Sequence, residues 1–251
     1  MPGIASSATS LLIQHLAANT TTLRVGAGGI MLPNHSPLMV AEHFGTLDTL
    51  FPGRIDLGIG RAPGSAGPAI RALRGDASER DFTQDIRQLT DYLADEGRQP
   101  VRAIPGKHNV PLWLLGSSLN SAELAAKSGL PYAFASHFAP HNLMDAIAYY
   151  RNNFRPSTTL QQPYVIVGAN VFAAPTRAEG EYLASSHRQW VSRLYAGKPG
   201  PLPHPEEGYM ERLTERDRYS LAQAMACTAV GDQDDVGSWL RQFIEIGRAH
   251  V

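Results

Sequence analysis

The chain has 251 residues, and its 22 lysines and arginines nearly balance 23 aspartates and glutamates, which gives a formal net charge of −1. This balance excludes long fields of one sign, so neither nucleic acid nor a membrane surface is an expected partner. Hydrophobic residues make up 43% of the chain and charged residues 18%, a globular composition that excludes disorder throughout.

Hydrophobic periodicity predicts an alternation of helices and strands along the chain. Helices are expected where apolar residues recur at three- and four-residue spacings, as at Phe82, Ile86 and Leu89. Strands are expected where short apolar runs end at glycine or proline. In chain order the predicted elements are a helix at 4–19, a strand at 23–27, a helix at 37–51, a strand at 55–60, a helix at 78–95, a strand at 111–115, a helix at 120–128, a strand at 132–135, a helix at 142–152, a strand at 164–173, and helices at 177–195, 211–226 and 232–244.

This repeated strand–helix order predicts an α/β fold with parallel strands and right-handed crossovers. Five strands are predicted, whereas a closed barrel needs eight, so either some strands are hidden or the chain is incomplete. No repeat, low-complexity tract or linker marks a second domain.

Cysteine content and hydropathy bear on the compartment. Cys227 is the single cysteine, so no internal disulfide can form, and a reducing, cytoplasmic setting is expected. No segment approaches the roughly 18 apolar residues of a membrane span.

Three predicted strand ends carry unusual motifs. They are Gly28-Gly29, Gly58-x-Gly60-Arg61 and Gly116-Ser117-Ser118. In parallel α/β sheets ligands lie beyond the carboxyl ends of the strands, and glycine there lets a flat ligand or a phosphate approach the backbone closely. The alternative is that these are ordinary turn residues.

Two of these motifs suit a phosphate. Ser117 and Ser118 precede the predicted helix start at 120–121 and offer hydroxyls, backbone N–H groups and a positive helix end. The alternative is simple helix capping. Arg61 offers a forked guanidinium after an apolar strand. Its alternative is an ion pair with one of three carboxylates, Asp56, Asp76 or Glu79.

Other reactive patterns are weak or absent. His137 and His141 have a spacing that zinc sites use, but no cysteine or HExxH pattern supports them, so no metal is expected. GxSxG, a P-loop and a complete GxGxxG do not occur. His35 and Glu42 are polar candidates near the first strand, and no catalytic residue is assigned.

Together, four stretches resemble the bacterial luciferase-like, flavin-dependent monooxygenase family, and the likeness extends to about Phe243. Their order along the chain is more specific than any single motif. The stretches are 1–7 (MPGIASS), 24–35 (RVGAGGIMLPNH), 51–64 (FPGRIDLGIGRAPG) and 112–118 (LWLLGSS).

The resemblance implies a TIM-type (β/α)8 barrel, usually dimeric, that binds reduced FMN, or deazaflavin F420 in some branches, at the strand carboxyl ends. It implies a monooxygenase that uses reduced FMN and O₂ on an unidentified organic substrate, with a separate flavin reductase as a possible partner. The alternatives are an F420-dependent hydride-transfer enzyme of the same fold and a non-catalytic flavin-binding protein.

The resemblance also implies roles for particular residues. Gly28 and Gly29 match a strand segment that often holds a non-proline cis peptide against the isoalloxazine ring. Arg61 matches the arginine on the phosphate side of the flavin, and 117–118 match the segment whose backbone holds the phosphate. Ser6 and Ser7 match a stretch near the ring.

The likeness leaves parts of the family barrel without a counterpart. The first two strands, the second of which ends in a functional histidine, and the last strand have no match, so the expected domain is an incomplete barrel over 1–244. Residues 245–251 do not continue the family pattern, and a common sequencing adapter would encode them. We therefore expect 245–251 to be a non-native tail.

Overall fold

The computed structural model describes residues 6–62, 72–73, 81–95 and 100–248. The first residues of the predicted helices at 4–19 and 78–95, and the end of the predicted tail, lie outside these ranges. The described chain confirms the predicted α/β class, because every paired strand runs parallel to its neighbours.

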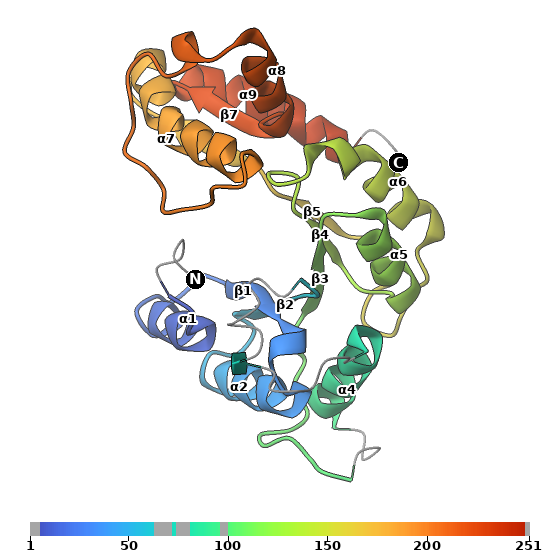
Figure 1. The fold of residues 1–251 in the computed structure, drawn as a ribbon. Helices are drawn as coiled ribbons and strands as arrows, with labels where there is room; N and C mark the ends of the chain where they lie inside the picture. Colours follow the sequence, from blue (N-terminus) through green and yellow to red (C-terminus); the bar gives the residue numbers. More distant parts are fainter. Residues whose placement is uncertain (1–5, 63–71, 74–80, 96–99, 249–251) are drawn as a thin grey trace.

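Five strands form the main sheet, in the order in which they occur along the chain. Helices lie between them in sequence, and Figure 1 shows the sheet as an arc with helices along its outer side. The strands are β1 (Val25–Met31), β2 (Ile55–Gly60), β3 (Leu112–Gly116), β4 (Tyr132–Phe134) and β5 (Val165–Val167). The helices around them are α1 (Thr9–Ala18), α2 (Pro37–Leu50), α4 (Phe82–Ala94), α5 (Leu119–Ser128) and α6 (Leu143–Asn153).

A second sheet contains two strands, β6 (Asn170–Ala173) and β7 (Thr228–Gly231). Around it lie α7 (Arg177–Tyr195), α8 (Glu215–Ala224) and α9 (Gln233–Arg248), at the opposite end of the arc from α1. Short 3-10 turns lie at Leu32–Asn34, Pro140–Asn142 and Met210–Arg212.

The prediction of one strand over 164–173 is wrong. The Gly168 N–H donates to the Phe134 carbonyl at 3.0 Å, which ends the pairing with β4. The Asn170 N–H then donates to the Cys227 carbonyl at 3.0 Å, which begins the pairing with β7. The segment therefore changes partner at 168–169 and serves two sheets. The sequence did not predict β7, since its four residues are too few to show periodicity.

The core lies between the main sheet and its helices. Ile55, Leu57 and Ile59 of β2 are 0% exposed, and every residue of β2 except Asp56 is buried because both faces of a parallel sheet are covered. The apolar positions of α4 predicted from periodicity are buried, and Asp81 caps this helix by accepting a hydrogen bond from the Thr83 N–H at 2.8 Å. Each such buried side chain contributes roughly 1.5–3 kcal/mol.

Two predicted boundaries differ near the start of the chain. α1 begins at Thr9 rather than near residue 4, because Ser6 makes a local turn in which its Oγ accepts from the Ala8 N–H at 3.2 Å. β1 does not end at Gly28-Gly29 but continues to Met31, because its pairing with β2 resumes beyond an irregularity at that point.

Candidate functional site

The carboxyl ends of β1, β2 and β3 lie next to one another at one edge of the main sheet. Met31 pairs with Gly60 across β1 and β2, and Ile59 pairs with Leu114 across β2 and β3. The three glycine motifs predicted from the sequence are thus brought together at this edge. We call it the β1–β3 mouth, formed by Gly28, Gly29, Gly60, Arg61, Gly116, Ser117 and Ser118.

The two glycines of β1 differ in what surrounds them. A Cβ on Gly29 would lie 2.7 Å from the Gly58 carbonyl oxygen, so this glycine allows close approach of β1 to β2. A Cβ on Gly28 would meet nothing within 4 Å, so the backbone there borders open space. The peptide bond between Gly28 and Gly29 is cis, as the resemblance implies. The strand therefore offers bare backbone that a flat ring could contact.

Arg61 follows β2 directly and is exposed. The alternative that Arg61 forms an ion pair with Asp56 is wrong. Asp56 instead accepts hydrogen bonds from the Arg24 guanidinium at 2.8 Å and from Trp113 Nε1 at 3.2 Å. The other two carboxylates considered lie outside the described residues. Among the described residues Arg61 has no hydrogen bond or ion pair, so its five N–H donors remain available to an anion.

The turn after β3 caps α5. Ser118 Oγ accepts from the Ser121 N–H at 3.4 Å, and Ser121 Oγ accepts from the Ser118 N–H at 3.2 Å, which makes a capping box. The capping alternative is therefore confirmed for the Ser118 hydroxyl. The first-turn amides of Leu119 and Asn120 have no acceptor within the described chain, and these two N–H groups can bind an anion.

A buried tyrosine lies beneath this turn. Tyr132 of β4 is 0% exposed, and its hydroxyl lies 2.8 Å from Ser121 Oγ. Burial raises the pKa of Tyr132 to about 12, so the phenol keeps its proton at neutral pH. The sequence did not point to this contact, although the Ser-x-x-Ser spacing at 118–121 was a signal for the capping box itself.

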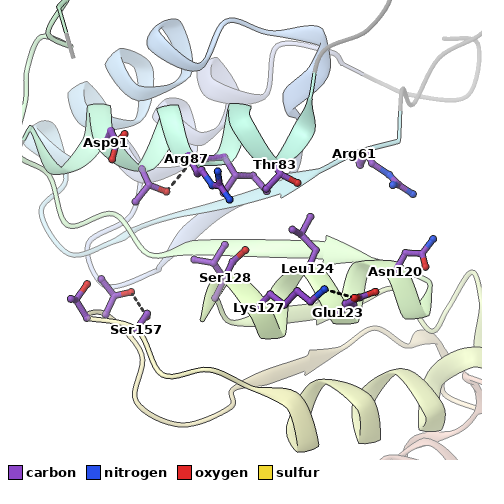
Figure 2. A pocket seen from close by; sticks show the side chains of 15 residues that line it. Arg61, Thr83, Arg87, Asp91, Asn120, Glu123, Leu124, Lys127, Ser128 and Ser157 are labelled. Carbon is purple, nitrogen blue, oxygen red and sulfur yellow. Dashed lines mark hydrogen bonds and ion pairs between the residues drawn. The ribbon is translucent and has the colours of Figure 1, made fainter. Parts of the chain in front are cut away.

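Arg61 also borders a groove of about 670 Å³ between α4 and α5. Figure 2 shows Arg61 and Asn120 near one end of this groove and Ser157 near the other. Lys127 in the groove is paired with Glu123 at 2.5 Å, whereas Arg87 is exposed. Of these three cationic residues, Arg61 is the one that directly follows a strand of the mouth.

The remaining predicted residues are not joined to the mouth by any contact that the described chain shows. Ser6 and Ser7 are exposed ahead of α1, and their place near the ring stays a prediction.

In the described ranges no group of three or more histidine, cysteine or acidic side chains is arranged to hold a metal ion. None of the described helices combines the length and the apolar character needed to span a bilayer.

Two half-buried histidines near the junction of the sheets predict an acid-sensitive fold. Burial lowers the pKa of His137, and burial together with the charge of His137 lowers the pKa of His187, both from 6.5. The unfolded chain therefore binds more protons than the folded chain just below pH 6.5, so the free energy of unfolding falls as pH drops from 7 toward 5.

Urea unfolding of the double variant His137→Gln, His187→Gln across this range checks that prediction. We expect a smaller loss of stability on acidification than in the wild type. His141→Gln is the control, because His141 is exposed. An unchanged acid dependence in the double variant would refute the assignment.

Comparison with known proteins agrees with this geometry. The family described as Luciferase-like monooxygenase matches residues 2–250. A luciferase-like monooxygenase of Escherichia coli (strain K12) is 48% identical over 97% of this chain and 74% of that protein. The N-acetyl-S-alkylcysteine monooxygenase of Bacillus subtilis (strain 168) is 33% identical over 96% of this chain and 74% of its own length.

Solved structures show the same fold. Apo-MsnO8 superposes with a TM-score of 0.78 at 35% identity, covering 94% of this chain and 72% of that chain. A type II Baeyer-Villiger monooxygenase from Pseudomonas putida in complex with FMN gives 0.65 at 17% identity, over 97% and 77% of the two chains. An F420-dependent secondary alcohol dehydrogenase gives 0.65 at 16% identity, over 96% and 76%. The last two support the fold alone.

Proposed function

The chain belongs to the luciferase-like monooxygenase family, and we propose that it is an oxygenase that uses reduced FMN and O₂ on an organic substrate. The observation that carries the proposal is the β1–β3 mouth. At one edge of the sheet it places bare glycine backbone, together with a guanidinium and two amides that have no partner among the described residues.

The residues of the mouth fit the parts of FMN. Arg61 and the amides of Leu119 and Asn120 would hold the phosphate dianion by charge-assisted hydrogen bonds. The open space beside Gly28 would admit the ring against the backbone of β1. The Pseudomonas monooxygenase, whose fold is similar, was solved in complex with FMN, and the similar alcohol dehydrogenase uses F420.

FMN would supply the redox chemistry, namely the reaction of its reduced form with O₂ and oxygen transfer to the substrate. The contribution of this chain is to bind the phosphate, to orient the ring through the backbone at 28–29, and to keep water away from it. The described residues of the mouth offer hydrogen-bond donors and no carboxylate, so their task is binding rather than proton removal.

Oxygen uptake tests the proposal. The protein is mixed with FMN, NADH and a separate flavin reductase, and thioethers of the kind named for the Bacillus relative form the first substrate panel. We expect oxygen uptake to rise when substrate is added and an oxygenated product to form. Free reduced FMN alone consumes oxygen but releases only peroxide. Tight FMN binding without any product would favour a non-catalytic flavoprotein. Reduction of F420 by an alcohol, with no FMN binding, would favour the hydride-transfer alternative.

We also propose that the protein, when full length, works in the cytoplasm as a homodimer that pairs through α1. Leu11, Leu12 and Leu16 on this ten-residue helix are 70%, 49% and 48% exposed, and a second copy would cover them. Sedimentation velocity should give a dimer for the wild type and a monomer for Leu11→Glu. Leu194→Glu, at a 46% exposed leucine of α7, should remain dimeric. A monomeric wild type would contradict the proposal.

A further inference from the structure

We propose that the hydroxyls of the partly buried Ser121 and the buried Tyr132 are positioning groups for phosphate, which hold the turn at 116–118 in its binding shape. This inference rests on the proposed function, since it concerns the same mouth. It assigns a role to two side chains that would not themselves touch the cofactor.

The two hydroxyls form one hydrogen-bonded set with the turn. Ser121 Oγ accepts from the Ser118 N–H at 3.2 Å and donates to the Ser118 carbonyl at 2.6 Å. Tyr132 Oη lies 2.8 Å from Ser121 Oγ and 3.3 Å from the Ser118 carbonyl. The Tyr132 hydroxyl thus meets both Ser121 Oγ and the Ser118 carbonyl, and it links the capping box to β4.

The turn is packed so closely on this set that it has little freedom. A Cβ on Gly116 would lie 2.1 Å from Ser121 Oγ, so only glycine lets the backbone lie against the hydroxyl. Directly after β4, the Ala135 N–H donates to the Gly116 carbonyl at 2.8 Å. Asn142 Nδ2 donates to the Ser117 carbonyl at 3.4 Å. The direction of the free amides of Leu119 and Asn120 follows from this arrangement.

Removing the Tyr132 hydroxyl would leave Ser121 Oγ held only by its two bonds to the Ser118 backbone, with no link to β4. The turn would then be held less tightly, and the amides that follow would spend less time aimed at one point. Phosphate binding should weaken, while contacts to the ring at β1 should not change. The effect is therefore specific to the phosphorylated form of the flavin.

The chain provides a matched control in Tyr150 of α6. Tyr150 is also 0% exposed, and its ring lies 5.4 Å from that of Tyr132 between centroids. Its hydroxyl donates to the Leu130 carbonyl at 2.8 Å and accepts from the Tyr164 N–H at 3.2 Å, so it does not touch the turn. Tyr150→Phe thus removes a buried phenolic hydroxyl without affecting the proposed set.

The experiment is fluorescence titration of wild type, Tyr132→Phe, Ser121→Ala and Tyr150→Phe with FMN and with riboflavin, which lacks the phosphate. We expect Tyr132→Phe and Ser121→Ala to weaken FMN binding by roughly 3- to 10-fold, the scale of one lost hydrogen bond. Their riboflavin affinities should stay within about twofold of wild type, as should both affinities of Tyr150→Phe.

The outcomes separate this inference from the proposed function. FMN affinity that is unchanged in both variants, or FMN and riboflavin affinities that fall equally, would overturn the positioning role and leave the proposed function standing. Absence of FMN binding in the wild type would overturn both. If Tyr132→Phe does not fold, the affinities of Ser121→Ala test the inference. This variant removes the same hydrogen bond between Ser121 and Tyr132, from the more exposed of the two residues.

Discussion

Replacing Gly58 with alanine is expected to abolish cooperative folding or to lower the free energy of unfolding by about 3 kcal/mol or more. The new Cβ would lie 2.2 Å from the Ala27 carbonyl oxygen and 2.6 Å from Leu115 Cδ1. A side chain can rotate away, but the carbonyl belongs to the paired backbone of β1. To relieve this clash, the pairing of β1 with β2 would have to break. The whole free energy of unfolding of a domain is only about 5–15 kcal/mol.

The matched variant is Gly28→Ala, at the residue that pairs directly with Gly58. Its Cβ would meet nothing within 4 Å, so the midpoint of urea unfolding should stay close to that of the wild type. Far-UV circular dichroism during urea unfolding measures both variants. Equal stability of the two variants would contradict the close contact between Gly58 and the backbone of β1.

Replacing Arg61 with alanine is expected to weaken FMN binding by roughly 10- to 100-fold, the range for loss of a charged hydrogen-bonding partner. Riboflavin affinity should change little, because the guanidinium serves the phosphate. Among the described residues Arg61 has no partner within the chain, so its removal should leave thermal stability nearly unchanged. FMN affinity should also fall with added salt in the wild type, and less so in the variant.

Arg87→Ala is the control for that experiment. Arg87 is exposed and lines the same groove, but it lies on α4 rather than at the end of a strand of the mouth. Its replacement should leave both affinities unchanged. Equal losses from the two variants would indicate that general positive charge near the groove, and not a phosphate site at Arg61, attracts FMN.

Much of the arrangement of the sheet could be predicted from local sequence. Parallel strands covered on both faces need continuous apolar runs, which is why the strand at 111–115 was recognised. The glycine motifs could be placed at one edge because parallel strands end together. The helix of Phe82–Ala94 was found from its apolar spacing and keeps that face buried.

Features that depend on distant partners could not be predicted in this way. The break at 168–169 exists because one segment pairs with β4 and then with β7, and β7 comes about sixty residues later along the chain. The support of the 116–118 turn by Tyr132 is likewise a contact between β4 and the segment that follows β3. The sequence read Gly28-Gly29 as the end of a strand, whereas pairing with β2 carries β1 on to Met31.

A crystal structure of the protein with FMN is the most direct test of the account, because its central claim concerns where the phosphate lies. We predict phosphate density within hydrogen-bond distance of Arg61 and of the amides of Leu119 and Asn120, with the ring against the backbone at 28–29. Ordered FMN whose phosphate lies away from Arg61 and the start of α5 would contradict the account.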